Sequence, residues 1–153
     1  MASWVQVETA DRSLADRVKR RFAMGTNKTI ATLRKDGGPR ISACEVEFRD
    51  GEVKLGMMPG SMKLLDLLRD ARIAIHCPTI EPTDEQSDGW PGDAKLAGVA
   101  VEVPEPADNT VEGARFFRVD VREVVLTYVA ETRDHLIVES WQEGRGVQRR
   151  PRY

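Results

Sequence analysis

A short segment near the middle of the chain has the residue types of an anion-binding site. Residues 56–63 read Gly-Met-Met-Pro-Gly-Ser-Met-Lys, and they join a strand pattern to a helix pattern. Ser61 is a good N-cap, because its hydroxyl can accept a hydrogen bond from a free N–H group of the first helical turn. Lys63 falls in that turn, where the helix dipole disfavours a cation by up to ~1 kcal/mol. A phosphate held between Lys63, the Ser61 hydroxyl and the backbone N–H groups would remove this conflict, so we predict a phosphate site.

The remaining reactive side chains predict neither a catalytic triad nor a metal site. The chain has two cysteines, Cys44 and Cys77, and two histidines, His76 and His135, and it has no CxxC motif. Both cysteines lie in predicted strands, where we expect reduced thiols packed as small core residues. His76 also lies in an apolar strand, and we expect it to be a core residue rather than a base. We therefore expect no metal, and no catalytic residue is assigned.

The composition predicts a single globular domain. The 153 residues are 31% charged, with a formal net charge of −2. This balance argues against general nucleic-acid binding, which favours a basic domain. The first residues lack the basic patch and apolar run of a secretory signal, and no stretch approaches the ~20 apolar residues of a membrane span. We therefore expect a cytoplasmic protein with no nucleic-acid and no membrane partner.

Apolar spacing predicts one helix and then a series of strands. Leu14, Val18 and Phe22 recur every four residues, which predicts a helix over residues 11–22. Beyond Gly25 the apolar period changes to two, and Asp-Gly turns separate the first strands, which is typical of an antiparallel meander. A slip in the apolar phase predicts a bulge or turn near residues 122–123. The predicted strands cover residues 28–35, 39–48, 52–58, 72–79, 94–103, 115–129 and 135–141.

A second helix is predicted after the third strand, over residues 61–70. Its apolar stripe comprises Met62, Leu64, Leu65, Leu67 and Leu68, and its outward face Lys63, Asp66, Arg69 and Asp70. Strands at this spacing predict a closed or partly closed antiparallel barrel. Residues 80–93 are predicted to form a solvated loop that carries Trp90. We interpret residues 1–153 as one domain, with an N-terminal helix within residues 1–24 and a basic tail over residues 142–153.

Three segments of the chain resemble the flavin-binding split-barrel family, the relatives of pyridoxamine 5′-phosphate oxidase. Residues 29–42 (TIATLRKDGGPRIS) resemble the family's opening hairpin, residues 60–74 (GSMKLLDLLRDARIA) its Ser-x-Lys helix, and residues 94–103 the strand that follows. The resemblance covers roughly residues 25–129, and its specificity comes from the order and spacing of the motifs. It implies a mainly β fold: a six- to seven-stranded antiparallel split barrel with an N-terminal helix and one helix inserted after the third strand.

The resemblance also implies a homodimer that holds FMN in a groove at the dimer interface. By position, Arg40 and Ser42 resemble phosphate and ribityl contacts from the second strand. Ser61 and Lys63 resemble the main phosphate contacts of the family, with Met62 between them in the same cofactor-binding segment.

Two further parts of the implied cofactor site come from other strands. Gly56, Met57 and Met58 resemble the backbone edge that meets the isoalloxazine ring. Lys95 takes a place where the family often has a polar residue that reaches the cofactor from the other chain. For Arg40 and Lys95, an ordinary exposed strand residue is an equally good interpretation.

The C-terminal segment departs from the family pattern. Pyridoxamine phosphate oxidases carry an Arg-x-His substrate motif there, whereas residues 141–153 contain no histidine, so vitamin B6 oxidation is not expected. The interpretation is an FMN-binding oxidoreductase acting on an unknown small molecule. The alternatives are a reductase of the same fold that uses the deazaflavin coenzyme F(420), or a non-catalytic flavin-binding module. A haem-binding split barrel would need a well-placed histidine ligand.

Overall fold

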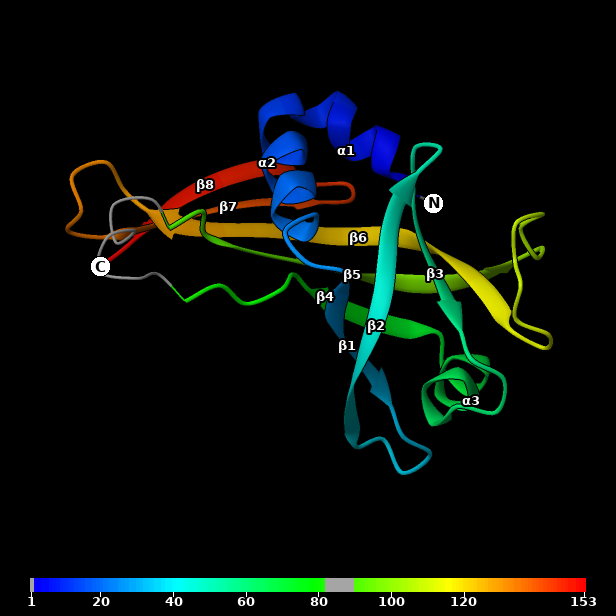
Figure 1. Cartoon of the computed structure of the whole chain (residues 1–153). Coiled ribbons are helices and arrows are strands. Elements are labelled where there is room, and N and C mark those ends of the chain that lie inside the picture. Colours follow the sequence, from blue (N-terminus) through cyan, green and yellow to red (C-terminus); the bar gives the residue numbers. More distant parts are fainter. Residues whose placement is uncertain (1, 82–89) are drawn as a thin grey trace.

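Three helices and eight strands follow one another along the described chain (Figure 1). The computed structural model describes residues 2–81 and 90–153. The helices are α1 (Trp4–Ala10), α2 (Arg12–Phe22) and α3 (Met62–Arg69). The strands are β1 (Asn27–Leu33), β2 (Pro39–Arg49), β3 (Glu52–Met57), β4 (Arg72–His76), β5 (Asp93–Val103), β6 (Arg115–Val129), β7 (Leu136–Gln142) and β8 (Gly146–Arg152). Each helix and strand expected from the sequence is present to within a few residues, and α1 and β8 are additional.

The first six strands close into an antiparallel barrel. The sheet order is β3-β2-β1-β4-β5-β6-β7-β8, and a further pairing between β3 and β6 closes the ring. The last two strands extend the sheet beyond the ring, because β7 pairs with β6 and β8 pairs with β7. The mainly β split barrel expected from the sequence is therefore confirmed.

The predicted irregularity in the long strand β6 is a β-bulge. Ala97 and Gly98 of β5 pair with Glu123 and Val121, which leaves Arg122 as the extra residue on β6. At Gly98 the two strands approach so closely that a Cβ atom would lie 2.1 Å from a backbone carbonyl oxygen of β6. Only glycine fits this approach, so Gly98 and the bulge occur together.

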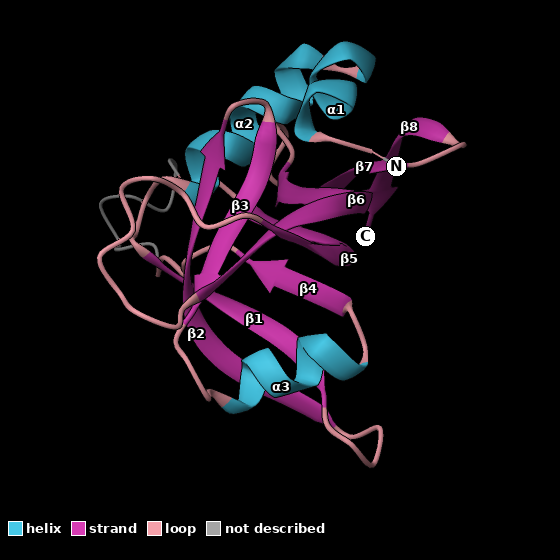
Figure 2. Ribbon diagram, turned by 90° about the vertical axis from the view of Figure 1, so that its right-hand side faces the viewer, coloured by secondary structure: helices cyan, strands magenta, loops and turns pink. Residues whose placement is uncertain are grey.

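Two helices cover one end of the barrel, and α3 lies at the opposite end (Figures 1 and 2). Leu14, Val18 and Phe22 of α2 are buried, as their spacing predicted. The ring of Trp4 on α1 packs edge-on against the ring of Phe48 on β2, with centroids 4.7 Å apart. With seven residues, α1 is too short for a helical period to stand out in the sequence, which is why it was not predicted.

Helix α3 buries a different face from the one predicted. Leu64 and Leu67 are buried as expected, but Met62 is 55% exposed. Asp66, predicted to face outward, is buried. The remaining predicted stripe residues, Leu65 and Leu68, are exposed as well. The reason is that Thr32 of β1 and Arg40 of β2 donate to the Asp66 carboxylate from beneath the helix, while Arg69 of α3 supplies a third donor.

The basic C-terminal segment, expected to be a tail, forms a strand. β8 pairs with β7 from Gly146 to Arg152, and its side chains are exposed. In the predicted loop over residues 80–93, residues 82–89, with Asp84, Glu85 and Asp88, lie outside the described residues. Trp90 is half-buried. None of the helices in the described part of the chain has the length and apolar character needed to cross a membrane.

Candidate functional site

The N-terminus of α3 is capped by Ser61, as the sequence predicted. Ser61 is the N-cap, and its Oγ accepts a hydrogen bond from the backbone N–H of Leu64 at 3.4 Å. Gly60, just before it, has a φ of 71°, a left-handed conformation that glycine adopts without strain. The backbone N–H groups of Met62 and Lys63 have no acceptor among the described residues. Two backbone donors at the positive end of the helix dipole are thus available to an anion.

Lys63 connects this helix end to β2. Its Nζ donates a hydrogen bond to the backbone carbonyl of Ala43 at 2.9 Å. The pairing of β2 with β3 runs only from Val46 to Arg49, so Ala43 lies on a part of the β2 edge that β3 does not cover. We call the space between this edge, the end of β3 and the first turn of α3 the β2–β3 gap. Lys63 reaches across this gap, and its ammonium retains further donors for a ligand.

Cys44 also lies beside the β2–β3 gap, on the inner face of β2. Its thiol Sγ is 3.7 Å from the backbone carbonyl oxygen of Gly56 on β3. Burial raises the pKa of the Cys44 thiol, and the neighbouring Lys63 ammonium opposes that rise. The first turn of α3, the middle of β2 and the end of β3 therefore meet around Lys63.

Arg40 and Ser42 share the inner face of β2 with Cys44, because alternate residues of a strand point the same way. Arg40 is not simply an exposed strand residue. Its Nε donates to Oδ2 of Asp66 at 2.7 Å, and the Arg40 side chain is 17% exposed. Ser42 is half-buried beside it. The structure thus places Arg40 under α3, where it holds the helix in position.

The carboxylate of Asp66 is the centre of that network. It is 1% exposed, and it also accepts hydrogen bonds from Oγ1 of Thr32 at 2.8 Å and from Nη2 of Arg69 at 3.0 Å. Burial alone would raise the pKa of Asp66, but the donors, Arg40 foremost, hold that pKa below its usual value. Sequence reasoning missed this network. The sequence feature that could have indicated it is the single aspartate, Asp66, between two Leu-Leu pairs.

Gly56, Met57 and Met58, the three residues expected at the flavin ring, differ in burial and orientation. Met57 is buried in the core, so only its backbone can contact a ligand. Met58 is exposed. Gly56 lies on the outer face of β3 against the ring of Phe116, which a Cβ atom at Gly56 would approach to 3.0 Å. Beside Gly56 is a hollow of about 410 Å³. Its lining includes Glu45, Glu47, Lys54, Pro106 and Phe116.

Lys95 does not join the β2–β3 gap within one chain. It is exposed on the outer face of β5, beside His76 of β4 and Val125 of β6. It borders another hollow, of about 310 Å³. Its lining includes a cross-strand row in which Ala31, Ala74 and Ala97 are neighbours on β1, β4 and β5. These small side chains leave a smooth apolar surface next to Lys95.

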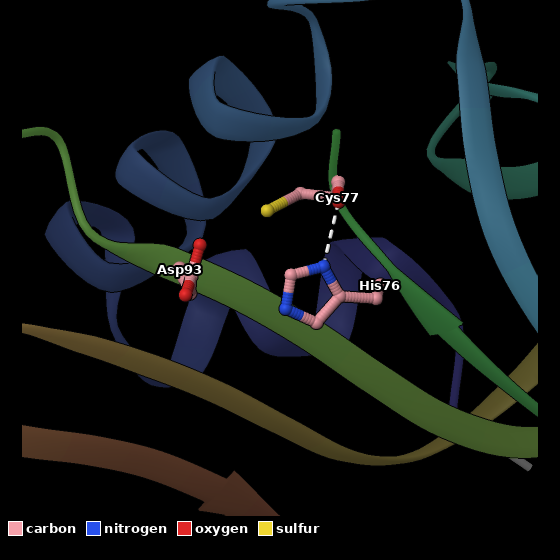
Figure 3. A group of neighbouring side chains, drawn as sticks. All are labelled: His76, Cys77 and Asp93. Atoms are coloured by element: carbon pink, nitrogen blue, oxygen red, sulfur yellow. Dashed lines mark hydrogen bonds between the residues drawn. The ribbon is translucent and has the colours of Figure 1, made fainter. Parts of the chain in front are cut away.

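A third group of side chains was missed by the sequence analysis. His76, Cys77 and Asp93 lie close together at the junction of β4 and β5 (Figure 3). His76 and Cys77 are adjacent in the chain, whereas Asp93 follows a long connection. The His-Cys pair was the available signal, and its third member could not be identified without the strand pairing.

The comparisons with known proteins agree with this architecture. No protein-family model matches the chain, and no curated protein matches it in sequence. A pyridoxamine 5′-phosphate oxidase-related, FMN-binding protein from Nostoc punctiforme matches in structure with 9% identity and a TM-score of 0.64, over 100% of this chain and 98% of the other. A heme-binding protein from Mycobacterium smegmatis matches with 16% identity and a TM-score of 0.57, over 91% and 87%. An F(420) reductase matches with 14% identity and a TM-score of 0.51, over 67% and 91%.

Similarity at this level of identity shows the fold. Together with the closed six-stranded ring and the inserted helix α3, it defines the chain as a split-barrel protein. Its fold is that of the relatives of pyridoxamine 5′-phosphate oxidase, as the sequence resemblance implied.

Proposed function

We propose that this protein is an FMN-binding oxidoreductase that acts on a small molecule. The observation that carries the proposal is the β2–β3 gap, where the Lys63 ammonium lies beside the capped N-terminus of α3, a combination that would suit a phosphate. The alternatives kept from the sequence are a reductase of the same fold that uses the deazaflavin coenzyme F(420), and a flavin-binding module without catalysis. We also propose that the protein is located in the cytoplasm.

In the proposed complex the phosphate lies at the first turn of α3. The backbone N–H groups of Met62 and Lys63, the Ser61 hydroxyl and the Lys63 ammonium supply its donors. Arg40 lies behind them, and Ser42 lies near the ribityl chain. Because Arg40 already pairs with Asp66, its proposed role is to fix α3 behind the phosphate.

The flavin ring is proposed to lie along the backbone edge of Gly56, Met57 and Met58. The hollow of about 410 Å³ beside Gly56 is within the usual size range of small-molecule sites. The flavin would supply the hydride chemistry, so the protein needs to provide only binding, orientation and electrostatics. This fits a site built from donors and backbone edges rather than from a triad.

A second copy of the chain completes the proposed site. The apolar hollow on β1, β4 and β5 is bordered by Ile41, which is 75% exposed, and by Lys95. A homodimer formed through this face would bury Ile41 and the alanine row. It would also bring Lys95 toward the cofactor of the other chain, which is the position that the family resemblance implies.

The visible absorption spectrum of the purified protein tests the proposal. A flavin spectrum, with FMN identified by mass spectrometry of the released molecule, is the expected result. A colourless protein that neither FMN nor the deazaflavin stabilises against heat would contradict the proposal. If haem is released instead of a flavin, the protein binds haem and the flavin proposal is wrong. Bound flavin that nicotinamide cofactors cannot reduce and no acceptor can reoxidise would favour the non-catalytic alternative.

A further inference from the structure

Three side chains that can bind a metal gather where β4 ends and β5 begins. They are His76, Cys77 and Asp93, and Figure 3 shows all three directed toward a common space. One ligand atom from each lies within 4.8 Å of the other two. We propose that this cluster binds a zinc-type divalent transition-metal ion. The site shares no residue with the β2–β3 gap and does not rest on the proposed function.

The fold brings the three residues together through the pairing of β4 with β5. His76, the last residue of β4, pairs with Lys95, and the backbone N–H of Cys77 continues the contact by donating to the carbonyl of Ala94 at 3.0 Å. Asp93 is the residue before Ala94, so it lies just beyond the end of β4. The backbone hydrogen bonds therefore fix the spacing of the ligands before any ion binds.

The imidazole of His76 is held in the form that a metal requires. Its Nδ1 lies 2.6 Å from the backbone carbonyl oxygen of Cys77. Because a carbonyl oxygen can only accept, Nδ1 must carry the proton. In the neutral ring, Nε2 then keeps its lone pair. A backbone carbonyl on the other ring nitrogen is the usual partner of a metal-binding histidine.

The thiol of Cys77 is also supported by the backbone. Its Sγ accepts a hydrogen bond from the N–H of Ala94 at 3.3 Å, and the side chain is buried. Burial raises the pKa of the thiol, and the nearby Arg21 guanidinium opposes that rise. On binding, the thiol releases its proton to solvent and the thiolate donates to the ion, so affinity should increase with pH.

Arg21 stabilises both segments that carry the ligands. Its buried guanidinium donates to the carbonyl oxygens of Gly92 at 2.5 Å and Pro78 at 2.6 Å. Its Nη2 lies 3.6 Å from Oδ1 of Asp93. Once the thiol has released its proton, the thiolate, the carboxylate and the guanidinium sum to one negative charge, and the bound divalent cation brings the local charge to +1. Arg21 thus orients the carboxylate without neutralising the whole site.

The chemical types of the three ligand atoms indicate which metal ion would bind. One nitrogen, one sulfur and one oxygen suit zinc, whereas calcium and magnesium prefer oxygen alone. Zinc bonds of about 2.0–2.3 Å in a tetrahedral site place the ligand atoms roughly 3.5 Å apart, so the cluster must contract by about 1 Å. Three protein ligands leave a fourth position for water. The bound ion would join the end of β4 to the start of β5.

Cobalt(II) is the probe for the test, because a cobalt–thiolate bond gives a charge-transfer absorption band. Chelator-treated protein is titrated with cobalt(II), and zinc is then added. We expect one cobalt per chain, the charge-transfer band, and loss of the band when zinc displaces cobalt. Zinc should also raise the midpoint of thermal unfolding, because it binds the folded chain. A folded wild-type protein that shows no charge-transfer band would overturn the proposal.

Matched variants identify the ligands. Cys77→Ser should abolish the band, whereas Cys44→Ser, at the other buried cysteine, should retain it. His76→Gln should weaken cobalt binding by at least roughly tenfold, and His135→Gln should not change it. A band that survives in Cys77→Ser would also overturn the proposal.

Asp93→Asn separates metal loss from misfolding. If Cys77→Ser fails to fold, Asp93→Asn still tests the site, because it keeps the thiol and the side-chain shape. We expect it to retain the band with cobalt affinity at least roughly tenfold lower. Near-ultraviolet circular dichroism in chelator should match the wild type. Unchanged cobalt affinity in the folded Asp93→Asn variant would remove Asp93 from the site and overturn the three-ligand cluster.

Discussion

Lys63 of α3 donates a hydrogen bond to the backbone carbonyl of Ala43 on β2, with 2.9 Å between Nζ and the oxygen. This bond joins the positive end of a helix to the strand edge that β3 leaves uncovered. A cation in the first turn of a helix is unfavourable by itself, and here it is held by a carbonyl dipole. The arrangement keeps an ammonium beside two backbone N–H donors, which is why we place the phosphate there.

Lys63→Ala should weaken FMN binding by about 1.5–3 kcal/mol, or roughly 10- to 150-fold, because a charge-assisted contact to the phosphate is lost. The free energy of unfolding of the protein without cofactor should hardly change, since the dipole penalty disappears together with the exposed bond to Ala43. Isothermal titration with FMN measures the first effect and thermal unfolding the second. Lys19→Ala, in the last turn of α2, is the control and should leave FMN affinity unchanged. Equal FMN affinity in the two variants would refute the site.

Asp66→Ala should lower the free energy of unfolding by about 3–5 kcal/mol, because it leaves the Arg40 charge without its buried partner. Urea unfolding at neutral pH measures this loss. The control, Asp70→Ala, removes a carboxylate that is 30% exposed and pairs with the exposed Arg72, so it should have a much smaller effect. Similar losses in both variants would mean that the Asp66 network does not hold α3.

The same residue predicts a pH dependence. The folded pKa of Asp66 lies below its unfolded value of about 3.9, so its stabilisation is complete above that pH. The stabilisation is lost as the pH falls through the folded pKa. The difference in stability between wild type and Asp66→Ala should therefore be constant near neutral pH and shrink in acid below about pH 4. A difference that stays constant down to pH 2 would contradict this assignment.

Arg17 and Glu139 should be coupled more strongly than an ordinary surface pair. Arg17 of α2 donates two hydrogen bonds to the Glu139 carboxylate on β7, at 2.7 and 3.0 Å, and Tyr128 donates a third at 2.6 Å. The hydrogen bond from Arg17 is the main cause of the lowered pKa of Glu139. A double-mutant cycle with alanine at both positions should give a coupling energy above about 1 kcal/mol, the upper limit for exposed pairs. The pair Glu8–Arg12, in which the arginine is exposed, measured in the same way, should give a smaller coupling of about 0.2–1 kcal/mol.

Gly98→Ala should destabilise the barrel, because its Cβ would lie 2.1 Å from the backbone carbonyl oxygen of Asp120. Backbone atoms cannot move aside as a flexible side chain can, so we expect a loss of about 1–3 kcal/mol in urea unfolding. In Gly38→Ala, the control, the nearest atom is the mobile carboxylate of Asp36, at 3.0 Å. A loss in Gly98→Ala no larger than in the control would show that the bulge relaxes freely.

Local patterns in the sequence were enough to predict most elements and the barrel. The period-two runs, the Asp-Gly turns and the phase slip at Arg122 each depend on neighbouring residues, and each prediction is confirmed. Ser61 was identified as an N-cap for the same reason, because capping involves only the next turn of the helix. Hydrophobic spacing was less reliable for α3, where Asp66 is buried and Leu65 and Leu68 are exposed.

Contacts between segments that are distant in the sequence decided the features that local patterns did not predict. Asp66 turns inward because Thr32 and Arg40, on two other strands, supply donors beneath α3. The basic segment becomes a strand because the free edge of β7 offers it a partner. Asp93 reaches the His76–Cys77 pair because β4 and β5 pair side by side. The sequence by itself therefore determined the elements and the capped turn, since these depend on local backbone preferences. Only the closed barrel decided which charges are buried and which ligands meet, because burial and pairing depend on the whole chain.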